Sequence, residues 1–127
     1  MIESVHHIAI IASDYSRSKA FYTEVLGLTI IKETFRSARN SYKLDLALNG
    51  QYIIELFSFP NPPQRRSFPE QAGLRHLAFK VKDVISARRT LLQKGIAVDE
   101  IRTDELTGKK FCFFNDPDGQ PLEFYES

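Results

Sequence analysis

The sequence has little of three things that would each point to a particular class of protein. It contains one cysteine, Cys112, so it can form neither an intramolecular disulfide nor a cysteine-based zinc cage. Its 17 basic and 16 acidic residues leave a net charge of +1, without the positive excess typical of nucleic-acid binding. The apolar run at residues 8–12 is too short for a signal peptide or a membrane span. We therefore expect a soluble protein of a reducing cytoplasm that binds neither nucleic acid nor membranes.

The apolar content, in contrast, is sufficient for a core. Of the 127 residues 43% are hydrophobic, and ten Phe and five Tyr argue against disorder. The length is typical of one compact domain. A chain of this size buries about two-thirds of the surface that its unfolded form exposes. We expect residues 1–127 to form a single domain.

An internal repeat is the most informative feature of the sequence. Four landmarks recur at an offset of 68 or 69 residues: His7 and His76, Asp14 and Asp83, Gly27 and Gly95, and Glu55 and Glu123. The histidines open similar runs, HIAI and HLAF, and each aspartate precedes a helical pattern. The chain is therefore interpreted as two copies of one unit of roughly 60 residues.

Each copy is predicted to contain one strand, one helix and three further strands. In the first copy, Asp14 suits a helix N-cap, Gly27 suits the residue that ends a helix, and Asn49-Gly50 is a strong hairpin signal. The expected strands of this copy are residues 6–12, 28–35, 42–48 and 52–59. In the second copy we expect strands at 75–81, 96–102, 109–115 and 121–127, and a helix at 83–94.

A segment with four prolines, residues 59–73, separates the copies. Proline cannot continue a sheet ladder, so this segment is predicted to be a linker between module one, about 4–58, and module two, about 74–127. The predicted fold class is α+β: two tandem βαβββ modules that form curled, barrel-like sheets around a metal site, with helices on one face.

The metal prediction comes from four polar residues on strands. Strand alternation sets His7, Glu55, His76 and Glu123 on the faces opposite the large aliphatic side chains. Burying an ionised glutamate without compensation costs several kcal/mol or more, so buried charges are paired or bind metals. Four isolated, partly exposed residues, or one His–Glu ion pair in each half, would also explain the pattern.

The repeat favours a shared site, because a pseudo-twofold relation maps His7 onto His76 and Glu55 onto Glu123. Two imidazoles and two carboxylates suit one divalent ion: Ni, Zn, Co, Mn or Fe. His6 competes with His7 for the first position, but strict alternation would direct its side chain to the opposite face.

At these residues the chain resembles the glyoxalase / bleomycin-resistance / extradiol-dioxygenase group, the vicinal oxygen chelate superfamily, and especially small bacterial glyoxalase I-like proteins. The stretches that carry the resemblance are HHIAIIASDYSRSKAFYTEVLG, YIIELFSFP, GLRHLAFKVKD and FFNDPDGQPLEFYE. The resemblance implies that the metal ligands are His7, Glu55, His76 and Glu123. It also implies a metal-dependent lyase or isomerase acting on a small substrate with vicinal oxygens through an enediolate.

Two positions depart from the glutathione-using members of this group. They place an arginine four residues after the first histidine and an asparagine four residues after the first glutamate, where this chain has Ile11 and Phe59. Neither side chain can donate a hydrogen bond to a carboxylate. We therefore expect feeble turnover of the methylglyoxal–glutathione adduct, and a different substrate whose recognition depends on residues 36–41 and 59–73.

Several alternatives stay open at this stage. The catalytic base is Glu123 or Glu55, with Glu123 the preferred choice. The other candidate functions are a thioester epimerase and a metal-independent protein that sequesters a small molecule, like bleomycin-resistance proteins.

The resemblance also implies a homodimer. Asp45 and Lys43 share a strand face, but surface alternation explains them equally well, and they are left out of the predicted site.

Overall fold

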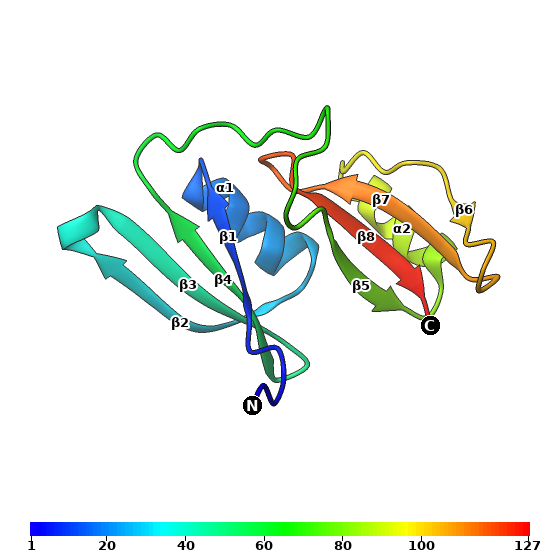
Figure 1. Ribbon diagram of the computed structural model, residues 1–127, viewed down its shortest axis with the longest axis horizontal. Helices are drawn as coiled ribbons and strands as arrows, with labels where there is room; N and C mark the ends of the chain where they lie inside the picture. Colours follow the sequence, from blue (N-terminus) through cyan, green and yellow to red (C-terminus); the bar gives the residue numbers. More distant parts are fainter. The chain divides into compact units, whose positions relative to one another are not determined.

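The computed structural model describes all residues from 1 to 127 and divides them into two compact units. Unit 1 is Met1–Gln64 and unit 2 is Arg65–Ser127. Each unit contains one four-stranded sheet and its own helix (Figure 1).

Unit 1 follows the predicted order of elements. Its parts are β1 (Ile8–Ala12), α1 (Tyr15–Ala20), the π-helix η1 (Phe21–Val25), β2 (Thr29–Arg36), the 3-10 helix η2 (Ser37–Arg39), β3 (Ser41–Leu48) and β4 (Gln51–Ser58). The sheet order is β1-β4-β3-β2, with β1 parallel to β4 and the other pairs antiparallel. Asn49 and Gly50, at φ 52° and 78°, form the tight turn between β3 and β4 that the sequence predicts.

Unit 2 repeats this plan. It consists of β5 (Leu77–Val81), α2 (Val84–Gln93), β6 (Arg102–Thr103), β7 (Lys110–Asn115) and β8 (Pro121–Glu126), in the sheet order β5-β8-β7-β6. As in unit 1, the first strand of the unit is parallel to the last. The prediction of two tandem βαβββ modules is confirmed.

The strand predicted at residues 96–102 is wrong for most of its length. Only Arg102–Thr103 forms a strand, and Val98 makes a single isolated bridge to Phe114. The Arg88 side chain of α2 donates hydrogen bonds to the carbonyls of Val98 and Asp99. These carbonyls are thereby satisfied by a helix side chain, so the segment does not need a full ladder with β7.

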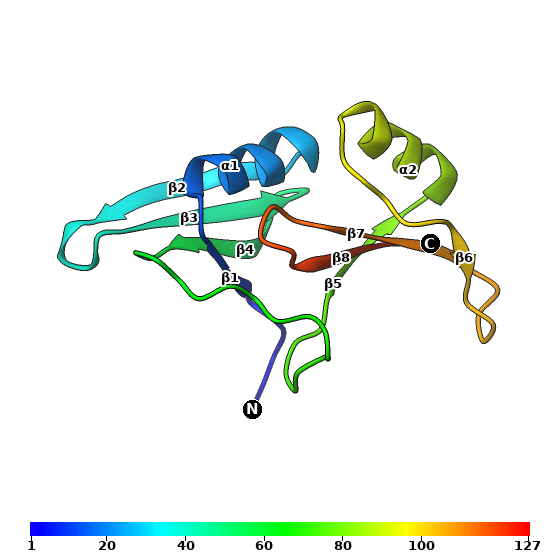
Figure 2. The ribbon, with the colours of Figure 1, turned by 90° about the horizontal axis from the view of Figure 1, so that it is seen from above.

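One face of each sheet is covered by the helix of the same unit (Figure 2). In unit 1 the fully buried side chains include Tyr22, Leu44, Leu46, Ile54 and Leu56. In unit 2 they include Val84, Leu91, Cys112 and Leu122. Cys112 is one of these core residues. Its burial raises the pKa of the thiol, which disfavours the thiolate that a nucleophile requires.

Both helices begin where the sequence predicts. The Asp14 carboxylate accepts a hydrogen bond from the Arg17 N–H, and the Asp83 carboxylate accepts one from the Ser86 N–H, each at 3.1 Å. Neither helix is long and apolar enough to cross a membrane.

Candidate functional site

The first predicted pair of site residues comes together in unit 1. The Nε2 atom of His7 lies 3.2 Å from Oε2 of Glu55. His7 directly precedes β1, and the parallel pairing of β1 with β4 sets Ala9 opposite Glu55. The side chain of Glu55 is 13% exposed and that of His7 is 35% exposed, so the pair is open to a ligand on the histidine side.

The second predicted pair comes together in unit 2 with the same register. The Nε2 atom of His76 lies 3.0 Å from Oε2 of Glu123, and Ala78 is opposite Glu123 in the parallel pairing of β5 with β8. Here too the glutamate is the more buried partner, 9% exposed against 29% for the histidine. The repeat seen in the sequence is thus a repeat of one His–Glu arrangement.

The geometry of each pair fits two ligands of one divalent ion. Ligands bonded to a metal at about 2.1 Å and separated by about 90–110° lie about 3.0–3.4 Å apart. The two observed N–O distances, 3.2 Å and 3.0 Å, lie in that range. Within neither unit does a third His, Cys, Asp or Glu side chain complete a metal-binding group. An ordinary His–Glu ion pair has the same N–O distance, and the sequence left that alternative open.

The other ring nitrogen of each histidine has a partner as well. Nδ1 of His7 lies 2.8 Å from Nδ1 of His6, and Nδ1 of His76 lies 3.1 Å from Nη1 of Arg75. A histidine that binds a metal through Nε2 carries its proton on Nδ1, and Arg75 cannot donate to a protonated nitrogen. Metal binding by His76 therefore requires Arg75 to move away from Nδ1.

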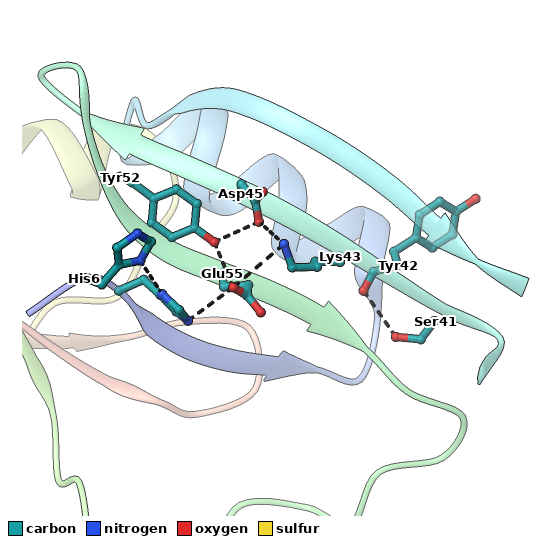
Figure 3. Close-up of polar contacts among 8 residues, drawn as sticks. His6, Ser41, Tyr42, Lys43, Asp45, Tyr52 and Glu55 are labelled. Atoms are coloured by element: carbon teal, nitrogen blue, oxygen red, sulfur yellow. Dashed lines mark hydrogen bonds and ion pairs between the residues drawn. The ribbon is translucent and has the colours of Figure 1, made fainter. Parts of the chain in front are cut away.

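The prediction that His6 faces away from His7 is wrong. Its ring lies against that of Tyr52, with centroids 5.1 Å apart, and its Nδ1 contacts His7 (Figure 3). The reason is that β1 begins only at Ile8. The alternation of a strand does not extend to the two residues before it.

A polar network surrounds Glu55 on the same sheet face (Figure 3). The Tyr52 hydroxyl lies 2.8 Å from Oε2 of Glu55 and 2.8 Å from Oδ1 of Asp45. The Lys43 ammonium donates to Oδ1 of Asp45 at 2.9 Å and lies 3.9 Å from Oε2 of Glu55. The Tyr52 hydroxyl has one proton, for which Glu55 and Asp45 are both acceptors, and Lys43 is a second donor to Asp45.

Sequence reasoning missed Tyr52 and set Asp45 and Lys43 aside. Strict alternation puts Tyr52 and Glu55, three residues apart, on opposite faces of β4. The pairing of β3 with β4 shifts register between Leu46 and Ala47, where two residues of β4 pass one of β3. Such a bulge redirects the side chains beyond it, and Tyr52 reaches Glu55. No residue type in the sequence marks this bulge.

The contacts in this network keep Asp45 ionised and Tyr52 protonated. Burial raises the pKa of Asp45, but the hydrogen bonds from Lys43 and Tyr52 outweigh it, and the net result is a pKa below the usual range. Burial, together with the hydrogen bonds to Glu55 and Asp45, raises the pKa of Tyr52 far above its usual value. Tyr52 is therefore a permanent donor to the carboxylates beside it.

Unit 2 lacks this network. Phe113 is the residue opposite Glu123, as Asp45 is opposite Glu55, and Phe111 stands where unit 1 has Lys43. The His76 ring meets the Phe113 ring edge-on, with centroids 5.0 Å apart. Glu123 forms an ion pair with His76. The two pairs therefore differ in surroundings: Glu55 is held by polar groups, and Glu123 is flanked by an aromatic ring.

The Glyoxalase/Bleomycin resistance protein/Dioxygenase superfamily matches residues 4–124. The chain is 61% identical to the uncharacterized protein YwkD of Bacillus subtilis (strain 168), covering 99% of this chain and 98% of that one. It is 30% identical to a 2-epi-5-epi-valiolone epimerase of Actinomyces, covering 94% of this chain and 77% of the epimerase.

Among solved structures, a glyoxalase family protein from Enterococcus faecalis matches with a TM-score of 0.91 at 46% identity, covering 98% of both chains. The sequence match and the structural match both point to one family. The repeated βαβββ unit, with a histidine and a glutamate at equivalent positions of both copies, is consistent with that family. The chain belongs to the Glyoxalase/Bleomycin resistance protein/Dioxygenase superfamily.

Proposed function

We propose that the protein is a metal-dependent lyase or isomerase of the glyoxalase I type that acts on a small substrate with two vicinal oxygens. His7, Glu55, His76 and Glu123 would together bind one divalent ion, Ni, Zn, Co, Mn or Fe. The observation that supports this most is the His–Glu pair at the same register position of both units, with N–O distances of 3.2 Å and 3.0 Å. The single buried cysteine is consistent with a reducing cytoplasm, which we propose as its compartment.

A bound divalent ion supplies Lewis-acid polarisation of the two substrate oxygens, which makes a neighbouring C–H bond more acidic. The residue that removes the proton must be a carboxylate free to move toward that carbon. Glu55 is held by the Tyr52 hydroxyl and has Lys43 nearby. Glu123 has an ion pair with its histidine alone. We therefore assign the proton transfer to Glu123 and a positioning role to Tyr52, which holds Glu55.

An epimerase is the second candidate, supported by the 30% identity to the Actinomyces epimerase. Epimerisation and glyoxalase-type isomerisation both begin with removal of a proton from a carbon beside a carbonyl. They differ in where the proton returns. A metal-independent binding protein, the third possibility, gives no reason to keep two largely buried carboxylates each beside a histidine.

The experiment that tests the proposal follows the proton itself. Metal-loaded protein is incubated in D₂O with hemithioacetals, 2-oxo-aldehydes and acyl thioesters, and loss of the ¹H signal of the acidic C–H is measured by NMR. We expect exchange for at least one compound class. Return of deuterium to the same carbon with inverted configuration indicates an epimerase, and deuterium on the neighbouring carbon indicates an isomerase.

Two variants make this experiment specific. Glu123→Gln removes the proposed base, which is also a proposed metal ligand, and should lower the exchange rate by at least about 10²–10⁴-fold. Glu126→Gln, in the same strand, is the matched control and should exchange at the rate of the unmodified protein. If no compound exchanges in metal-loaded protein, or if the two variants behave alike, the proposed function is contradicted.

A further inference from the structure

A second charged group lies on the same sheet face as the His7–Glu55 pair. Arg36, the last residue of β2, is paired in register with Ser41, the first residue of β3. Its Nη2 atom donates to the Ser41 hydroxyl at 2.8 Å, which confirms that both side chains lie on one face. Lys43 and Asp45 follow Ser41 on that face, and Lys43 reaches Glu55. Arg36 and Glu55 therefore face the same side of unit 1.

The Arg36 guanidinium is held by aromatic rings rather than by a counter-ion. Its central carbon lies 4.8 Å from the centroid of the Phe57 ring and 5.7 Å from that of Phe59. These two rings stack on each other with centroids 5.6 Å apart and an angle of 19°. Stacking on aromatic faces fixes the plane of the guanidinium without neutralising its charge. Arg36 forms no ion pair, unlike Lys43 and Lys19 of the same unit.

The hydrogen-bonding capacity of Arg36 is also incomplete. Its Nε is buried and has no hydrogen-bond partner. Buried donors are nearly always satisfied, and the exceptions call for an explanation such as a missing ligand. A charged, oriented and partly unsatisfied guanidinium is the kind of group that binds a carboxylate or a phosphate.

We propose that Arg36 anchors an anionic group of the substrate. This inference names the substrate class of the proposed site and in that respect rests on the proposed function. Phe57 is two residues from Glu55 along β4, a separation of about 7 Å in a strand. We take this strand spacing as the approximate separation between the anionic group of the substrate and its vicinal oxygens. The Phe57 ring, which lies beside Arg36 and two residues from Glu55, favours a flat or apolar part between the anionic group and the vicinal oxygens.

A matched pair of probes tests this requirement. Both 3,4-dihydroxybenzoate and 3,4-dihydroxybenzamide have vicinal oxygens on a flat ring, and they differ only in the charge of the group at the far end. Isothermal titration calorimetry on cobalt-loaded protein should show the carboxylate compound bound about tenfold or more tightly, as expected for a charge-assisted hydrogen bond. The preference should disappear in Arg36→Met and be reduced in Arg36→Lys, which keeps the charge without the planar fork.

Arg17→Met is the control, because Arg17 is an exposed arginine of the same unit that lies in α1, outside residues 36–41 and 59–73. It should keep the full preference. A wild-type protein that binds both probes equally, or an Arg17→Met variant that loses the preference as Arg36→Met does, would overturn the inference.

A second readout does not need the metal. The Nε–H resonance of Arg36, identified as the arginine side-chain signal absent from Arg36→Lys, is followed by ¹H–¹⁵N NMR in metal-free protein. Addition of 3,4-dihydroxybenzoate should shift this resonance, and the benzamide should not. If the resonance shifts but the protein binds no metal, the proposed function fails and the anion site stands. If metal binds and the resonance never responds, the anion site fails alone.

Discussion

At the scale of single residues, Tyr52 is the side chain that distinguishes the two His–Glu pairs. Its hydroxyl contacts Glu55 and Asp45, and unit 2 has no equivalent contact to Glu123. Partners that orient a metal ligand commonly contribute 10–100-fold to metal affinity. The polar network of unit 1 therefore serves to hold Glu55 in place.

We predict that Tyr52→Phe weakens metal binding by about 10–100-fold while the protein stays folded, because the substitution removes only the hydroxyl that contacts Glu55 and Asp45. Calorimetric titration of metal-free protein with Co²⁺ measures the change. Tyr15→Phe is the matched control, since Tyr15 donates to Glu33 on an exposed part of unit 1. Equal affinities of Tyr52→Phe and the unmodified protein would show that Tyr52 does not position Glu55.

Asp45 gives a prediction about pH. Its pKa in the folded protein lies below the unfolded value, so its contribution to stability is present above about pH 4 and is lost as the pH falls through the lowered pKa. The unmodified protein should therefore exceed Asp45→Asn in stability at pH 7 by about 1–3 kcal/mol. Urea unfolding at several pH values down to about 3 measures this difference. A difference that stays constant or grows on acidification would argue against the assigned ion pair with Lys43.

At the scale of elements, the helix caps can be tested as a matched pair. The carboxylates of Asp14 and Asp83 accept from the third residue after them in α1 and α2. Replacing either by alanine should lower the free energy of unfolding by about 0.5–2 kcal/mol, measured by urea unfolding. Asp99→Ala, outside both helices, should cost less. If neither alanine variant lowers the free energy of unfolding, the helix starts are fixed by packing alone.

The strands also show which features of the fold and the site could be predicted from the sequence. Alternation and turn residues predict the strands, because Ile54, Leu56 and Leu122 must be buried against helices. The same reasoning fails at Val98, where a side chain of α2 takes the backbone carbonyls. It also fails at Tyr52 and His6, where a bulge and the start of β1 interrupt the alternation. Local patterns predict regular strands, and the site depends partly on irregular positions that tertiary contacts decide.

At the scale of the whole molecule, we predict a homodimer. β2 is an edge strand of its sheet and exposes Ile30, Ile31 and Phe35, each about half accessible. An exposed edge strand is a template for pairing with a second chain, and exposed apolar patches mark interaction sites. Light scattering at tens of micromolar should give twice the chain mass of 14.6 kDa, and Ile31→Lys should shift the population toward monomer. A monomer at that concentration contradicts the prediction.

The central claim is that His7, Glu55, His76 and Glu123 bind one metal ion together. Mass spectrometry of the metal content, after loading and exhaustive dialysis, tests it most directly. We predict about one ion per chain, lost in each of His7→Ala, Glu55→Gln, His76→Ala and Glu123→Gln and retained in His6→Ala. Two ions per chain, each lost only through variants of its own unit, would contradict a shared site. No retained metal would reduce both pairs to ion pairs.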